Sequence, residues 1–222
     1  MFRTLICLAS AAALATATAA LSTTGAQAAA RPQAATLVKT VSLDIDGDAK
    51  PDVLRLYRLT ASKWKAKVTT ATGKVASRTF TSTIVKDWGA ASPWGGAARL
   101  DAVRGYEVKM LTAGGDGAAE IVLTWRSGAL VKEKAPASPW GMTGWYEGGP
   151  GGFGHGYAFF TSLGKHYVNT YGLTRTSAGK YKGTVYRSKW VSGAWKKVET
   201  ITVSLTQAQF DTELKDQAVW IK

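Results

Sequence analysis

The sequence predicts a mainly β protein built from antiparallel hairpins, and three observations support this class. From Thr36 onward, short runs rich in Val, Thr, Tyr and Trp alternate with breaks rich in Gly, Ser, Asn and Asp, which is typical of many short strands. The 222 residues are 45% hydrophobic and 10% aromatic, which excludes a disordered chain. One Cys and two His exclude a disulfide scaffold and a structural zinc site.

The N-terminus predicts a secretory signal peptide over residues 1–30. Arg3 gives a positive start, an apolar run of small residues extends from Leu5 to Leu21, and A-x-A sites end at Ala28 and Ala30. The run is diluted by Ala and Thr, which argues against a permanent membrane span. We therefore expect cleavage after Ala28 or Ala30, loss of Cys7 with the signal, and a secreted, extracellular chain without a membrane span.

Residues 31–222 are expected to form a single β-repeat domain. In residues 63–68 lysines alternate with apolar residues, and this pattern predicts a half-buried strand. The apolar residues that share a face are Trp64, Ala66 and Val68 here, and Ile121, Leu123 and Trp125 in a second strand. Near the C-terminus, Thr206 and Gln209 have the spacing of a capping box, so a short helix is expected after Thr206.

The domain contains an internal repeat of hairpin-like segments. These segments centre on Trp64, Leu130 and Trp195, which are 66 and 65 residues apart. An Ala-Ser-Pro-Trp-Gly sequence also occurs twice, at residues 91–95 and 137–141. A near-constant period predicts three copies of one supersecondary unit, whereas the alternative is that the shared residues are common hairpin chemistry. The expected units span approximately residues 36–100, 101–155 and 156–222.

The segment from Asp44 to Asp52 carries the strongest chemical signal. Its four carboxylates within nine residues repel one another, and a hard cation removes this conflict. Calcium takes about six to eight oxygen ligands. The expected ligands are the carboxylates of Asp44, Asp46, Asp48 and Asp52 and the backbone carbonyl of Lys50. The alternative is an Asp-Gly turn with solvated carboxylates.

This segment resembles the calcium loop of FG-GAP (VCBS) repeats, the D-x-D-G-D-G-x-x-D hairpin of integrin-α-like β-propeller blades. The matching residues are Asp44, Asp46, Gly47, Asp48 and Asp52, and Ala49 stands where the family has Gly. The resemblance implies a structural Ca²⁺ and propeller-blade-like units. It covers the first two units, and the third is expected from the hairpin period of about 65 residues alone. Closed propellers typically have about four to eight blades, so the units are expected to form an open or merged assembly, or two chains to associate.

A second acidic segment, residues 112–122, resembles a degenerate copy of this loop. It keeps the G-D-G core and an acid at its end but lacks the first two carboxylates, which leaves Asp116 and Glu120 as a weak second metal site. A bare turn is the favoured alternative for this copy. Asp101 and Glu107 bound a weaker acidic echo, and the third unit, around Lys182, has no acids and is expected to bind no metal.

Charge and aromatic residues indicate the kinds of partner. Lys and Arg number 28 against 15 Asp and Glu, and the formal net charge of +13 favours an anionic partner or serves solubility. A ligand face is expected from tryptophans in Gly- and Pro-rich turns, namely Trp88, Trp94, Trp140 and Trp145, unless these side chains plug the ends of sheets. The fitting partners are an anionic or carbohydrate polymer of the cell wall, or a protein. No specific nucleic-acid motif is present.

These features predict a secreted calcium-binding β-repeat protein that acts as a non-catalytic binding or structural module at or outside the cell surface. The alternative is a secreted glycan-active hydrolase that uses the Gly- and Trp-rich loops. Its candidate acid and base groups are His155, Glu147 and Asp87. The sequence contains no G-x-S-x-G nucleophile elbow.

Overall fold

The computed structural model describes residues 34–149, 152–177, 179–215 and 220–221. The signal peptide expected over residues 1–30 lies outside the described residues. None of the helices in the described part of the chain has the length and apolar character needed to cross a membrane.

The structure confirms a mainly β protein with antiparallel sheets and a short C-terminal helix. The first sheet contains β1 (Thr36–Leu43), β2 (Asp52–Arg58), β3 (Lys63–Thr69) and β4 (Val75–Thr81). The second contains β5 (Trp94–Ala98), β6 (Glu107–Ala113), β7 (Gly117–Arg126), β8 (Ala129–Glu133), β9 (Trp145–Gly148), β10 (Phe153–Ser162), β11 (Lys165–Ser177), β12 (Lys180–Val191) and β13 (Ala194–Thr206). The helices are α1 (Ile84–Trp88) and α2 (Gln207–Lys215).

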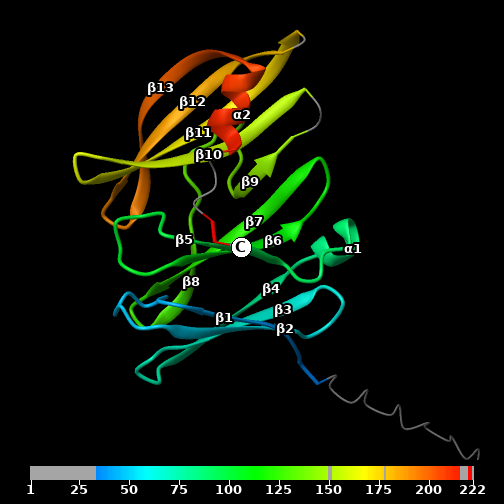
Figure 1. The fold of residues 1–222 in the computed structure, drawn as a ribbon, viewed down its shortest axis with the longest axis vertical. Coiled ribbons are helices and arrows are strands. Elements are labelled where there is room, and N and C mark those ends of the chain that lie inside the picture. Colours follow the sequence, from blue (N-terminus) through cyan, green and yellow to red (C-terminus); the bar gives the residue numbers. More distant parts are fainter. Residues whose placement is uncertain (1–33, 150–151, 178, 216–219, 222) are drawn as a thin grey trace, which may run out of the picture. The chain divides into compact units, whose positions relative to one another are not determined.

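The first sheet is a meander in which each strand pairs with the next (Figure 1). In β3, Trp64, Ala66 and Val68 are fully buried, whereas the lysines between them are exposed or partly exposed. The alternation predicted for this strand is therefore confirmed. The acidic segment connects β1 to β2, at one end of this sheet.

The second sheet has the order β13-β12-β11-β10-β9-β7-β6-β5, and β8 pairs with β7. Strand β7 is buried on both faces. Leu123 and Trp125 pack in the core shared with the first sheet, and Val122 packs in a second core on the opposite face. The predicted common face of Ile121, Leu123 and Trp125 is confirmed, since Ile121 packs against the first core as well.

Three hydrophobic cores organise the described residues. The first core joins the first sheet to β5–β8 and includes Trp64, Met110 and Leu123. The second draws on β5, β7, β9, β10, β11 and β13. The third lies on β11 and β12 and is covered by α2, where Tyr181 stacks on Phe210 with ring centroids 4.0 Å apart.

The hairpins predicted around Trp64, Leu130 and Trp195 are all present, as β2–β3, β7–β8 and β12–β13. The last two turn on Ser-Gly pairs whose residues both have positive φ, the geometry of a tight type I′ turn. The strands do not separate into three sheets, and residue 155, the expected end of the second unit, lies within β10. The described strands close into neither a barrel nor a propeller.

A capping box begins the C-terminal helix, as the sequence predicts. The backbone N–H of Thr206 donates to Oε1 of Gln209 over 2.9 Å, and the backbone N–H of Gln209 donates to Oγ1 of Thr206 over 3.3 Å. These bonds satisfy donors that the first turn of a helix leaves without partners. The cap thus fixes the start of the helix that covers the third core.

Replacing Thr206 by Ala is expected to lower the free energy of unfolding by about 1 kcal/mol, because the cap hydroxyl is lost. Urea denaturation measures the change. Thr206→Ser keeps the hydroxyl and is expected to retain the wild-type value. An Ala variant as stable as the Ser variant would show that the cap contributes nothing to stability.

Candidate functional site

The acidic loop between β1 and β2 brings three carboxylates together. One oxygen from each of Asp44, Asp46 and Asp48 lies within 4.8 Å of the others. Each side chain also accepts a backbone N–H: Gly47 donates to Asp44 over 2.8 Å, Asp48 to Asp46 over 3.2 Å, and Lys50 to Asp48 over 2.8 Å. The loop therefore presents a set of oxygen donors of the kind that a hard cation prefers.

The tight wrap of this loop depends on two residues with positive φ. Gly47 has a φ of 81°, and a Cβ at this position would lie 2.6 Å from the Cβ of Arg104. Ala49 has a φ of 67°, the left-handed conformation that Gly adopts most easily. Ala49 therefore occupies a backbone conformation that suits glycine.

The charges in the loop act on one another. Desolvation raises the pKa of the Asp46 carboxyl, and the charges of Asp52, Asp48 and Asp44 raise it further, while the N–H of Asp48 opposes both effects. Arg99 lies near the loop, with its Nη2 3.7 Å from Oδ2 of Asp44. The guanidinium is largely exposed, so it offsets only part of this repulsion.

Asp52 has a different role from the other three aspartates. Its side chain is fully buried, and its Oδ2 accepts the N–H groups of Ile45 at 2.7 Å and Asp46 at 3.0 Å. Its Oδ1 accepts the N–H of Ala71, in the β3–β4 connection, at 2.8 Å. Asp52 thus connects the loop to the rest of the first sheet by hydrogen bonds, and it is not part of the convergent group. Lys50, whose carbonyl is the fifth expected ligand, is an exposed residue.

A groove of about 460 Å³ brings together candidates from three separate parts of the sequence prediction. It is lined by Trp88 at the end of α1, Trp94 of β5, Lys109 of β6, Glu120 of β7 and Glu147 of β9, with Asp116 before β7. Two members of the expected ligand face, both residues of the expected second metal site and one hydrolase candidate therefore share one surface.

Lys109 dominates the electrostatics of this groove. Its Nζ lies 2.9 Å from Oε2 of Glu147 and 3.4 Å from Oε1 of Glu120, and its side chain is only 4% exposed. The ammonium therefore already supplies a positive charge beside Glu120. Among the described residues, Asp116 and Glu120, the expected second metal site, do not belong to any group of three or more acidic side chains that converge on one point.

The four tryptophans of the expected ligand face have different environments. Trp88 is 49% exposed and lies over Gly114, and Trp94 is partly buried in the groove wall. Trp140 packs against Phe153, with ring centroids 6.0 Å apart. Trp145 lies in the second core and donates its Nε1–H to the carbonyl of Glu133. Only Trp88 and Trp94 therefore share a surface that a ligand can reach.

The remaining hydrolase candidates are held by internal bonds. His155 is buried, with Nε2 2.9 Å from Oγ of Ser138 and Nδ1 2.7 Å from the carbonyl oxygen of Tyr146, and its burial lowers the pKa of the imidazole. Asp87 accepts hydrogen bonds from Thr83 and the backbone of Gly114, which lower its pKa. Neither residue lines the groove.

A second convergent group, which the sequence did not reveal as a unit, consists of Asp101, Glu107 and Glu133. All three are buried, with one oxygen of each within 4.8 Å of the others. Nη2 of Arg126 forms an ion pair with Asp101 and lies 3.5 Å from Oε1 of Glu107. Trp195 donates its Nε1–H to Oε1 of Glu133 over 2.8 Å.

Burial and mutual repulsion raise the pKa values of this second group. Burial raises the pKa of Glu107 to about 7, and the charge of Asp101 adds to the effect. Burial raises the pKa of Glu133 to about 8, with a further contribution from the charge of Glu107. The pKa of Asp101 is also raised, mainly by burial. The cluster therefore disfavours its own full ionisation.

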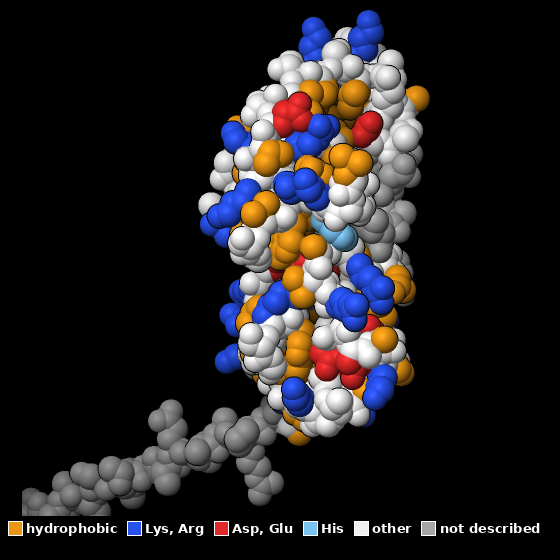
Figure 2. Space-filling model, turned by 90° about the vertical axis from the view of Figure 1, so that its left-hand side faces the viewer, with side chains coloured by type: hydrophobic (Ala, Val, Ile, Leu, Met, Phe, Trp, Pro, Cys, Tyr) orange, Lys and Arg blue, Asp and Glu red, His pale blue; other side chains and the backbone are white. Residues whose placement is uncertain are grey.

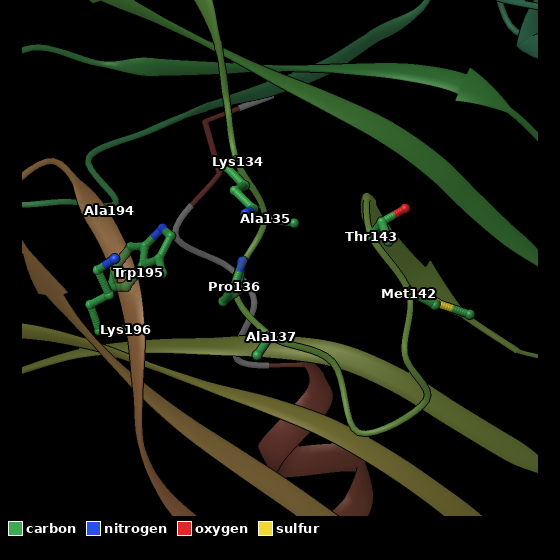
Figure 3. Close-up of a pocket in the computed structure, with 9 residues that line it drawn as sticks. All are labelled: Lys134, Ala135, Pro136, Ala137, Met142, Thr143, Ala194, Trp195 and Lys196. Carbon is green, nitrogen blue, oxygen red and sulfur yellow. The ribbon is translucent and has the colours of Figure 1, made fainter.

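Two pockets adjoin this cluster. The larger, about 330 Å³, lies between the β8–β9 connection and the start of β13, and Figure 3 shows the side chains of Lys134, Trp195 and Lys196 around it. The smaller, about 190 Å³, shares Lys134 with it and reaches Arg126 and Glu133.

Lys and Arg side chains are spread over the face of the molecule that Figure 2 shows.

No protein-family model, curated protein or solved structure matches this chain. The functional assignment therefore depends on the acidic loop, the groove and the buried carboxylates themselves. Lys109, Arg126 and Glu133 are the residues of these sites that sequence patterns did not single out, because each acquires its partners only in the folded chain.

Replacing Asp52 by Asn is expected to lower the free energy of unfolding by at least about 2 kcal/mol, because an amide NH₂ would face buried N–H donors. Chemical denaturation with a chelator present measures this loss without any contribution from bound metal. Asp48→Asn, at an exposed position of the same loop, is the matched control and is expected to change stability little under these conditions. Equal losses in the two variants would contradict a special role for Asp52.

Proposed function

We propose that the chain is a secreted, calcium-stabilised β-repeat protein and a non-catalytic binding module, and that its groove between Trp88 and Trp94 binds a carbohydrate. The observation that carries this proposal is the convergence of two tryptophans with several charged side chains in one groove. Indole faces pack on the apolar faces of sugar rings, and carboxylates and ammonium groups bond to their hydroxyls. The groove volume of about 460 Å³ is in the usual range for small-molecule sites.

The ion pairs of the groove favour binding over hydrolysis. A glycoside hydrolase needs one protonated carboxyl group as a general acid. Glu120 and Glu147 instead share the ammonium of Lys109, and an ion-paired carboxylate accepts hydrogen bonds without donating a proton. Lys109 thus keeps both carboxylates ionised, and Glu147, whose side chain is 20% exposed, can accept hydrogen bonds from sugar hydroxyls.

The acidic loop fits a structural Ca²⁺ held by Asp44, Asp46 and Asp48. Its support is the convergence of three carboxylate oxygens at the junction of β1 and β2, together with the left-handed Ala49 at the position of the family's Gly. A bound Ca²⁺ would neutralise the carboxylates and stabilise the connection between the two strands. The three hairpins at near-constant spacing support an FG-GAP-like, three-unit organisation.

Calcium is expected to raise the melting temperature relative to a chelator. At a hundredfold excess of free calcium over its Kd, the stabilisation is about 2.7 kcal/mol. Asp46→Asn is expected to remove the loop's share of this gain while changing stability in chelator little. Asp116→Asn, in the groove, is the control and is expected to keep the full response. Equal melting temperatures with calcium and with chelator would contradict the proposed metal.

A glycan array followed by titration calorimetry tests the groove. Trp88→Ala is expected to weaken binding of the selected glycan about tenfold, since it removes an aromatic contact worth about 1.4 kcal/mol. Phe160→Ala, which removes a partly exposed ring elsewhere on the second sheet, is the control and is expected to bind normally. Unchanged binding by Trp88→Ala would contradict the groove, and release of reducing ends from the glycan would contradict a non-catalytic role.

A further inference from the structure

The buried carboxylates of Asp101, Glu107 and Glu133 come from three separate segments of the chain. Asp101 lies in the β5–β6 connection, Glu107 begins β6, and Glu133 ends β8. Their exposed fractions are 2%, 1% and 8%, and one oxygen of each lies within 4.8 Å of the others. Calcium–oxygen distances are about 2.3–2.6 Å, so three oxygens this close to one another can contact one Ca²⁺ ion.

Glu133 supplies an independent indication of a missing partner. Its Oε1 accepts the indole N–H of Trp195, but its Oε2 is buried and has no hydrogen-bond partner among the residues that the structure describes. Both oxygens of Glu107, in contrast, accept hydrogen bonds, from the N–H of Leu100 and from Oγ1 of Thr124. A buried carboxylate oxygen without a partner is costly, and a cation would satisfy it.

The charges of the cluster indicate the charge of the ligand. Among the described residues, the guanidinium of Arg126 forms ion pairs with two of the three acids, Asp101 and Glu107. When all three acids are ionised, their sum with Arg126 is two negative charges, which one divalent cation balances. Protonation of two carboxyl groups would balance it as well, and the two possibilities differ in whether metal binds.

The cluster also adjoins a space through which an ion and its water ligands can enter. The pocket of about 190 Å³ is lined by Thr124, Arg126 and Glu133 among others. Three protein carboxylates leave calcium several ligand positions for water. The donors are all oxygen, with neither thiolate nor imidazole among them, which favours Ca²⁺ over zinc or copper.

We infer that Asp101, Glu107 and Glu133 form a second calcium site, separate from the acidic loop and independent of the function proposed for the groove. The ion would connect the β5–β6 connection, β6 and β8 within the second sheet. Through the bond between Glu133 and Trp195, it would also stabilise the start of β13 beside the larger pocket (Figure 3).

Counting bound ions by equilibrium dialysis with radioactive calcium tests this site in the full chain. The unchanged chain is expected to bind two ions, and Glu133→Gln one. Glu199→Gln, an exposed glutamate paired with Arg187, is the matched control and is expected to bind two. A Glu133→Gln chain that binds as many ions as the unchanged chain overturns the inference.

The loop variant separates this site from the proposed loop calcium. If only the buried site exists, the chain binds one ion, which Asp46→Asn keeps and Glu133→Gln loses, and the inference stands. If only the loop site exists, the single ion is lost in Asp46→Asn and kept in Glu133→Gln, and the inference fails.

Terbium luminescence detects an ion at the buried site without mutating any of the three acids. In the Asp46→Asn chain, terbium at the buried site is expected to emit when tryptophan is excited, because Trp195 is bonded to Glu133. Calcium is expected to displace this emission, and Trp195→Phe to reduce it. Absence of sensitised emission in the Asp46→Asn chain overturns the inference.

Discussion

The burial of β7 on both faces is the constraint on which the candidate sites depend. One face packs in the core shared with the first sheet through Leu123 and Trp125, and the other packs in the second core through Val122. The groove lies at the beginning of this strand, where Gly117 and Glu120 line it, and the buried carboxylate cluster lies at its end, where Thr124 and Arg126 contact Glu107. A strand held between two cores moves little, so both sites are built on a rigid element.

The same double burial forces charged side chains into the interior, where they require partners. Lys109 and Glu120 face each other on neighbouring strands with side chains 4% and 2% exposed, and Arg126 compensates two buried acids. Buried ion pairs gain little net stability, but an incorrect strand register would leave each charge unpaired at a high cost. These pairs therefore favour one register of β6 against β7. The Lys109–Glu120 ion pair in the groove therefore also favours the correct register of the sheet.

The sequence predicted features that depend on neighbouring residues. The alternation around Trp64, the capping box of Thr206 and Gln209, and the hairpins around Leu130 and Trp195 all follow from contacts a few residues apart. The spacing of the loop aspartates likewise anticipated the convergence of three of them, but not the burial of Asp52, which depends on the distant N–H of Ala71. Trp88 and Trp145 each have a Gly as a sequence neighbour, Gly89 and Gly144, yet Trp88 is 49% exposed while packing in the second core buries Trp145. Glu133 gave no signal because its neighbours in the cluster are more than twenty residues away.

The segment from Arg99 to Glu107 joins the two acidic groups physically. At the loop, Arg99 approaches Asp44, and the N–H of Tyr106 donates to the carbonyl of Asp44 over 2.9 Å. A Cβ on Gly105 would overlap the carbonyl of Ile45, so the loop and this segment are in close contact. The same segment carries Asp101 and Glu107 into the buried cluster. A Ca²⁺ at the proposed loop site and one at the proposed buried site would therefore both stabilise this one segment. Two ions that stabilise the same segment would each favour binding of the other.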